Sequence, residues 1–212
     1  MHRVLSLRHL TGSVYVLRLE RKGLSFKAGQ FITLTDLRTG QKREYSVYSG
    51  QNDDYLEVLV REVEAGKVSR RLKKLLPGDS IDVEGPFGFF RLDPAHYPSG
   101  KLMFVATGTG ISPFHSFARS YPTADFSLIH GVRLAEEAYD YQDYDRNRVV
   151  QCVSGEDAGD FHGRVTAFLA ACDPEADTHF FLCGNSRMID DAFDILTGRG
   201  IAVSQIHSEV YF

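Results

Sequence analysis

The chain has 212 residues, 43% of them hydrophobic, which is enough to bury one large core or two smaller ones. Its 24 basic and 28 acidic side chains give a formal net charge of -4, so no overall positive field favours nucleic acid or an anionic membrane surface. Any basic docking surface must therefore be local.

The opening residues MHRVLSLRHLTGSVYVLRLE alternate apolar and polar positions without a long hydrophobic run. This pattern is not typical of a signal peptide or a membrane span, and it predicts a cytoplasmic protein. The three cysteines, Cys152, Cys172 and Cys183, are too few and too far apart for the spacings that hold iron–sulfur centres. We therefore expect free thiols, and any iron–sulfur partner would be a separate protein.

Six short segments of the first half alternate with the period of two that is typical of β-strands. One helix is expected over residues 67–76, where apolar side chains recur at helical spacing before Pro77-Gly78 ends it. These elements predict a small antiparallel β-barrel over residues 1–98. The expected strands are roughly residues 3–8, 13–20, 30–34, 43–48, 55–63 and 80–84.

The pattern changes after residues 93–100, where the apolar run LMFVATG ends in glycines and a helical stretch follows. Later apolar runs begin at Phe126, Val149, His179 and Ile201, and they alternate with helical stretches near residues 164–171 and 187–196. This alternation predicts an α/β domain with a parallel sheet over residues 99–212. Ligands of such domains bind outside the carboxyl ends of the strands.

Four motifs occur in the order REYSVYS (43–49), GKVS (66–69), GTGISP (108–113) and CGN (183–185). Together they resemble the bacterial ferredoxin–NADP reductase family over nearly the whole chain. The resemblance implies an FAD-dependent oxidoreductase in which NAD(P)H gives a hydride to flavin N5. The flavin then passes electrons singly to ferredoxin or flavodoxin.

The first two motifs are expected to hold FAD. The resemblance assigns Arg43 to the pyrophosphate, Tyr45 to the isoalloxazine and Ser46 to the N5 region. An arginine fork matches phosphate oxygens, an aromatic ring offers stacking area, and a hydroxyl both donates and accepts hydrogen bonds. The helix that begins at the second motif presents free backbone N–H groups to the pyrophosphate. Its expected contacts are Gly66, Lys67, Val68 and Ser69.

The same short helix carries a concentration of basic side chains on an otherwise acidic protein. These charges either attract an acidic electron carrier or simply keep a solvated helix face soluble, and the sequence leaves both readings open. The side chains are Lys67, Arg70, Arg71, Lys73 and Lys74.

The third and fourth motifs are expected to hold the nicotinamide dinucleotide. A strand that runs into a glycine turn and a helix lets backbone amides approach a phosphate closely. By resemblance, Gly108, Thr109 and Gly110 border the dinucleotide pyrophosphate, and Thr109 also touches the flavin. Cys183 and Gly184 end a later strand, where the family places a thiol beside the transferring carbon. The alternative reading of Cys183 is a small buried core residue.

Two arginines are candidates for the adenosine end. Arg133 in HGVR and Arg164 in HGRV match family positions, and a bidentate arginine recognises the ribose 2′-phosphate of NADP(H). However, Gly155 follows Ser154 where the NADP-selective pattern usually has an arginine. NAD(H) is therefore an alternative to NADP(H).

The chain ends in SEVYF, which resembles the E-V-Y ending of plant-type members whose terminal tyrosine covers the flavin. Tyr211 is the matching position, but Phe212 follows it, so either ring is a candidate for this cover. Glu209 matches a carboxylate near the reactive site that relays a proton or places the nicotinamide amide. The alternative is an exposed glutamate without a role.

Two further functions are kept as alternatives to the reductase that serves ferredoxin or flavodoxin. One is an NADH-dependent reductase component of an oxygenase. The other is a regulatory flavoprotein subunit whose nicotinamide site is degenerate. A metal centre is not expected, because the eight histidines form no close ligand motif.

Overall fold

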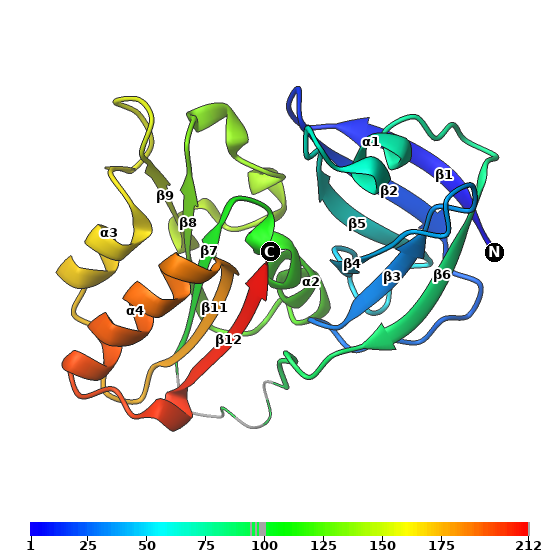
Figure 1. The fold of residues 1–212 in the computed structure, drawn as a ribbon. Helices are drawn as coiled ribbons and strands as arrows, with labels where there is room; N and C mark the ends of the chain where they lie inside the picture. The colour runs from blue at the N-terminus through cyan, green and yellow to red at the C-terminus, as the bar shows by residue number, and fades with distance from the viewer. Residues whose placement is uncertain (94, 96, 98–100, 212) are drawn as a thin grey trace. The chain divides into compact units, whose positions relative to one another are not determined.

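The computed structural model describes residues 1–93, 95, 97 and 101–211 (Figure 1). The chain forms two compact units, which are treated separately below. Unit 1 comprises Met1–Leu92 and Ser112–Pro122, and unit 2 comprises Asp93–Ile111 and the chain from Thr123 onward. The expected break near residue 98 lies outside the described residues, so the division into residues 1–98 and 99–212 stays a prediction.

The sheet of unit 1 is antiparallel throughout, and its six strands have the order β4-β3-β6-β1-β2-β5. A bridge between Val47 and Val58 joins the two ends of this order. The predicted antiparallel barrel is thereby confirmed. The strands are β1 His2–His9, β2 Val14–Glu20, β3 Phe31–Thr35, β4 Lys42–Ser46, β5 Tyr55–Arg61 and β6 Ser80–Phe87.

Helix α1 spans Lys67–Leu72 and contributes Val68 and Leu72 to the core of unit 1. It is shorter than the expected helix over residues 67–76. After Leu72, the N–H of Leu75 bonds to the Leu72 carbonyl at 3.1 Å, a tighter turn than an α-helix makes. The buried Leu75 therefore still packs on the core although the helix has ended.

Helix α2 spans Ser112–Ser120 and packs on residues of unit 1. The His115 ring stacks on Tyr48 with centroids 3.8 Å apart, and its Nδ1 donates to the Tyr48 carbonyl at 2.7 Å. The Ser116 hydroxyl donates to the Ser49 carbonyl at 2.7 Å. The GTGISP motif is thus divided, since its glycines belong to unit 2 and its Ser-Pro begins a helix of unit 1.

The sheet of unit 2 is parallel throughout, with six strands in the order β10-β9-β8-β7-β11-β12. The predicted parallel α/β architecture is confirmed. The last strand begins at residue 206, later than the apolar run at Ile201 suggests, because residues 203–205 form a short turn. The strands are β7 Leu102–Thr107, β8 Phe126–Val132, β9 Val149–Val153, β10 Phe161–His162, β11 His179–Asn185 and β12 Ile206–Tyr211.

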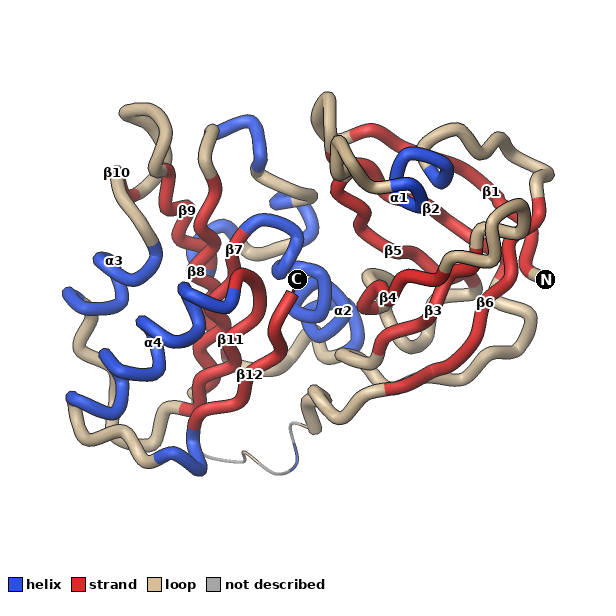
Figure 2. The backbone as a smooth tube through the Cα atoms, viewed as in Figure 1, coloured by secondary structure: helices blue, strands red, loops and turns tan. Residues whose placement is uncertain are grey.

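Two helices, α3 Val165–Ala171 and α4 Ser186–Gly198, lie on the same side of this sheet (Figures 1 and 2). Leu169 and Leu196 are buried against the sheet residues Val105 and Leu182 in one core cluster. Packing of the two helices therefore stabilises the sheet, in which β7 and β11 carry the nicotinamide motifs at their carboxyl ends. Within the described ranges, no helix is long and apolar enough to span a bilayer.

A charge network holds the loop between β9 and β10. Arg146 Nη2 lies 2.6 Å from both carboxylate oxygens of Asp160, and Asp160 Oδ2 accepts from the Gln151 N–H at 2.7 Å. Burial alone would raise the Asp160 pKa, but these hydrogen bonds lower it below its ordinary value. The ionised carboxylate therefore stabilises the fold.

Replacing Asp160 with asparagine should lower the free energy of unfolding by about 0.2–1 kcal/mol at neutral pH, the range for exposed ion pairs. A lowered carboxyl pKa stabilises the fold above the unfolded value of about 3.9 and ceases to do so as pH falls through the lower folded value. The difference between the two proteins should therefore shrink towards about pH 3. Urea unfolding at neutral and acid pH measures it, and an equal difference at every pH would contradict this assignment.

Candidate functional site

The REYS motif lies on β4, at one end of the strand order of unit 1. Arg43 is exposed and its guanidinium donates to the neighbouring Lys42 carbonyl at 2.7 Å. Tyr45 is half-buried and packs against the barrel core, and Ser46 is buried at the end of the strand. Arg43 pairs with Leu34 and Tyr45 with Ile32, so both lie on the face expected from the alternation.

Tyr15 connects this motif to GKVS, a role that no motif in the sequence indicates. Its buried hydroxyl donates to the Ser69 carbonyl of α1 at 2.5 Å. Burial, together with the nearby Tyr45, raises the Tyr15 pKa above its ordinary range, and burial raises the Tyr45 pKa to about 12 against the opposing charge of Arg43. Both phenols are therefore neutral, and Tyr15 lies near residues of both FAD motifs.

The beginning of α1 fits an anionic group. Gly66 precedes the helix, and among the described residues no side chain caps its first N–H groups. The Ser69 hydroxyl instead accepts from the Val63 N–H at 3.1 Å. Uncapped N–H groups, the exposed Arg43 fork and a half-buried aromatic ring match a pyrophosphate and a planar ring system. The residues of unit 1 therefore fit FAD.

The basic side chains of α1 are only partly balanced by acidic ones. Lys73 Nζ lies 2.5 Å from Glu62 Oε2, and Arg70 lies 3.9 Å from the same carboxylate. Lys67 and Lys74 are exposed and Arg71 is half-buried. A local positive surface therefore exists on unit 1 despite the negative net charge.

The glycine turn at Gly108–Ile111 follows β7 and contacts the CGN motif directly. Gly108 has φ +52°, and Thr109 is half-buried in the turn. A Cβ atom at Gly110 would lie 2.4 Å from the Cys183 carbonyl oxygen and 2.7 Å from Gly184 Cα. No side chain fits there, so the third and fourth motifs meet backbone to backbone at the carboxyl ends of β7 and β11.

Cys183 is fully buried on β11, in register with Glu209 on the neighbouring β12. Burial raises the Cys183 pKa well above its ordinary value, the Glu209 charge raises it further, and the interaction with Tyr211 opposes both. The thiol is therefore protonated at neutral pH, which suits positioning rather than nucleophilic attack. Phe212 lies outside the described residues.

Arg133 and Arg164 are both exposed, and each follows a strand of the unit 2 sheet. Arg133 follows β8, Arg164 precedes α3 after β10, and β9 lies between those strands in the sheet. The Gly155 N–H donates to the Arg133 carbonyl at 2.8 Å, and a Cβ at Gly155 would lie 2.7 Å from Arg133 Cγ. A side chain at position 155 would overlap Arg133 and displace it. The glycine therefore allows Arg133 to keep its observed position.

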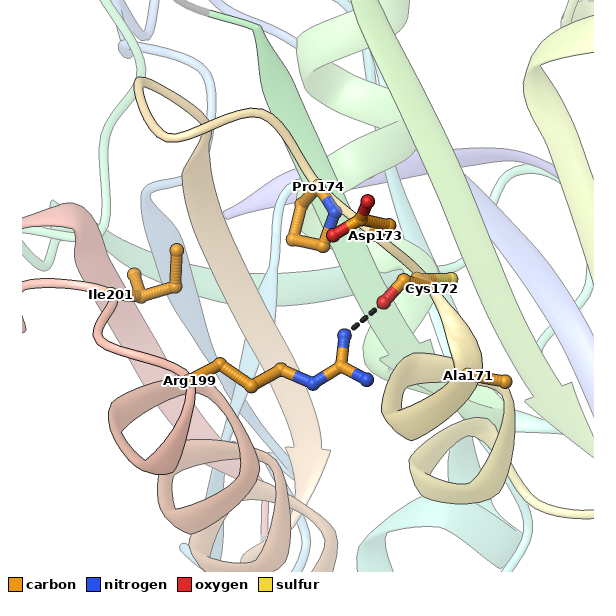
Figure 3. Close-up of a pocket in the computed structure, with 6 residues that line it drawn as sticks. All are labelled: Ala171, Cys172, Asp173, Pro174, Arg199 and Ile201. Carbon is orange, nitrogen blue, oxygen red and sulfur yellow. Dashed lines mark hydrogen bonds between the residues drawn. The ribbon is translucent and has the colours of Figure 1, made fainter.

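A pocket of about 370 Å³ lies elsewhere in unit 2 (Figure 3). The Arg199 guanidinium donates there to the carbonyls of Cys172 and Ala170, at the end of α3. An adjoining pocket is lined by Leu102 and Thr178, beside the starts of β7 and β11. The pocket is therefore at the amino ends of the strands, away from the motifs. Its lining residues are Ala171, Cys172, Asp173, Pro174, Arg199 and Ile201.

The described part of the chain contains no group of three or more His, Cys, Asp or Glu side chains that could hold a metal ion. The cysteines are free thiols.

Comparison with known proteins identifies both halves of the site. Residues 9–92 match the oxidoreductase FAD-binding domain, and residues 104–194 match the oxidoreductase NAD-binding domain. A reductase subunit of an aromatic O-demethylase from Amycolatopsis is 28% identical, over 89% of this chain and 61% of that subunit. The solved structure of a ferredoxin NADP+ reductase from Neisseria gonorrhoeae with bound FAD and NADP has a TM-score of 0.85 and 26% identity, over 100% of this chain and 98% of that one.

Ferredoxin–NADP reductase B from Sorangium cellulosum is 31% identical to this chain. The similarity covers 99% of this chain and 96% of that protein. It includes both units and all four motifs. The chain therefore belongs to the ferredoxin–NADP reductase family of FAD-dependent oxidoreductases.

Proposed function

We propose that this protein transfers electrons between NADP(H) and a ferredoxin or flavodoxin. The observation that carries the proposal is the backbone contact of Gly110 with Cys183 and Gly184, because it joins the phosphate-binding turn to the thiol expected beside the reacting carbon. The Sorangium relative, named a ferredoxin–NADP reductase, supports the choice of carrier. Three separate thiols are too few to hold an iron–sulfur centre in this chain, which is consistent with an external carrier.

FAD supplies the redox chemistry when bound, since its N5 accepts a hydride from the nicotinamide and its electrons leave singly. Arg43 and the first N–H groups of α1 bind the pyrophosphate. Tyr45 packs on the ring, and the Ser46 hydroxyl bonds near N5. These residues act by holding and orienting rather than by reacting.

On the nicotinamide side, the glycine turn binds the dinucleotide pyrophosphate through its backbone. The neutral Cys183 thiol fills the space beside the reacting carbon without introducing a charge. Glu209 orients the nicotinamide amide or holds a proton, and an aromatic ring from Tyr211 or Phe212 excludes water until nicotinamide enters. Catalysis by this chain is therefore mainly alignment in a dry site.

Replacing Arg133 with alanine should raise the KM for NADPH about tenfold and leave the KM for NADH nearly unchanged, because a charge-assisted bond to the 2′-phosphate contributes about 1.5–3 kcal/mol. Arg164→Ala should act in the same direction. The matched control is Arg38→Ala, which removes an exposed arginine from unit 1. Equal losses for NADPH and NADH would show that Arg133 does not read the phosphate.

We also propose that the basic face of α1 docks the acidic carrier. Reversing two charges in Arg71→Glu/Lys74→Glu should lower kcat/KM for the carrier about tenfold at low salt, because electrostatic steering controls association. Reduction of the flavin by NADPH should not change. The control Lys27→Glu/Arg38→Glu makes the same change in net charge elsewhere on unit 1. If both double variants lose carrier activity equally, only net charge matters.

A second candidate is an NADH-dependent reductase component of an oxygenase. The Amycolatopsis relative is named the reductase subunit of an aromatic O-demethylase, and Gly155 stands where the NADP-selective pattern usually has an arginine. A clear preference for NADH over NADPH would favour it. For either function we propose a cytoplasmic location, which the free thiols support.

A further inference from the structure

His130 is a buried histidine that contacts both the glycine turn and the segment that follows β8. It belongs to β8, where it is in register with Ala106 of β7 and Gln151 of β9. Its exposed fraction is 0%. A fully buried polar ring must form hydrogen bonds with both nitrogens to avoid a large desolvation cost.

Both ring nitrogens of His130 have partners. Nε2 lies 2.8 Å from the carbonyl oxygen of Gly108, the first residue of the glycine turn. Nδ1 lies 2.8 Å from the Tyr141 hydroxyl. Because a carbonyl oxygen only accepts, Nε2 must carry the proton, and the neutral ring then accepts from Tyr141 at Nδ1. The Gly108 carbonyl therefore selects the tautomer, and the Tyr141 hydroxyl satisfies the other ring nitrogen.

The ring keeps this neutral form. Burial lowers the His130 pKa to about 4, although the bond to Gly108 and the charge of Glu137 act in the opposite direction. Tyr141 is also neutral, since burial raises its pKa above the ordinary range. The two hydrogen bonds are therefore intact throughout the physiological range.

A second set of contacts links the same ring to the segment that carries Arg133. The Tyr139 ring packs on His130 with centroids 5.7 Å apart, and its hydroxyl donates to Glu137 Oε1 at 3.0 Å. Glu137 Oε2 accepts from the Arg133 N–H at 2.9 Å. A continuous series of contacts thus runs from the Gly108 carbonyl to the backbone of Arg133.

We propose that His130 is a positioning residue for the nicotinamide dinucleotide, whose Nε2–H holds the Gly108 carbonyl and thereby sets the shape of the glycine turn. This inference rests on the function proposed above. Gly108 has φ +52°, a conformation that glycine adopts easily but also leaves easily, so an external hydrogen bond is needed to select it. His130 provides that bond, and the Tyr141 hydroxyl satisfies the other nitrogen of the buried ring.

Two polar variants of similar size separate this role from simple core filling. Glutamine can place its amide nitrogen near the position of Nε2 and keep the bond to Gly108, whereas the shorter asparagine cannot. His130→Asn should weaken NADP+ binding about tenfold, which corresponds to about one ordinary hydrogen bond. His130→Gln should remain within about threefold of the natural protein.

The measurement is calorimetric titration of the oxidised, FAD-loaded proteins with NADP+, together with their thermal midpoints. The control His2→Asn changes another buried histidine, which bonds the Glu20 carbonyl at 2.7 Å in unit 1, and should leave the NADP+ Kd unchanged. Nitrogen-15 NMR should show a protonated Nε2 on His130. Equal losses in His130→Asn and His130→Gln, or no loss in either, would overturn the inference, whereas absence of NADP+ binding by the natural protein would instead overturn the proposed function.

Discussion

Replacing Gly110 with alanine should lower the free energy of unfolding of unit 2 by about 1–3 kcal/mol, because the added methyl group has no room. The new Cβ would lie 2.4 Å from the Cys183 carbonyl oxygen, and both neighbours are backbone atoms that cannot turn aside. The glycine turn and the CGN motif must therefore separate. We expect NADPH binding to weaken at least about tenfold, since each 1.4 kcal/mol corresponds to that factor.

The matched control for this change is Gly198→Ala, at the end of α4 in the same unit. A Cβ there would meet nothing within 4 Å. Alanine in a helix should be stabilising by up to about 1 kcal/mol relative to glycine, with no effect on NADPH binding. Urea unfolding and NADPH titration of both variants give the comparison. An unchanged NADPH affinity in Gly110→Ala would contradict the assignment of the turn.

Deleting Tyr211 and Phe212 together should tighten NADP+ binding about tenfold. If a terminal aromatic ring occupies the position of the nicotinamide, the dinucleotide must displace it, and a stacked ring contributes about 0.5–1.5 kcal/mol beyond its buried area. Without the competing ring, nicotinamide binding no longer has to offset that free energy. Titration of the oxidised protein with NADP+ measures the change.

Deleting Phe212 alone identifies which ring is responsible. Tyr211 pairs in register with Asn185, so it is already held at the carboxyl end of β11. If Tyr211 is the cover, the shorter deletion should leave the NADP+ Kd unchanged; if it reproduces the full effect, Phe212 is the cover. An unchanged Kd in the double deletion would contradict a C-terminal cover altogether.

The fold could be predicted from local patterns because each unit has one strand type. Alternation gave the barrel strands, and continuous apolar runs gave the buried parallel strands. The sequence did not reveal the packing of α2, whose His115 stacks on Tyr48, because burial against a distant segment leaves no local periodicity. It also placed the last strand early, since Val203–Gln205 forms a turn although its composition suits a strand.

The candidate site was predicted where short motifs carry a recognisable chemistry. The structure brings GTG against CGN, while the roles assigned to these residues stay predictions. The sequence did not predict those site residues whose roles depend on tertiary contacts. Tyr15 looks like any aromatic residue in an alternating strand, and His130 like any core histidine. Only the fold shows that one bonds to the Ser69 carbonyl and the other to the Gly108 carbonyl.

The most direct test of the whole account is anaerobic stopped-flow reduction of the FAD-loaded protein by NADPH and, separately, by NADH. Bleaching of the oxidised flavin band should be faster and saturate at lower concentration with NADPH. That result would support Arg133 and Arg164 as readers of the 2′-phosphate. Preference for NADH would favour the oxygenase-reductase alternative, and no reduction by either dinucleotide would contradict the assignment of this chain as a reductase.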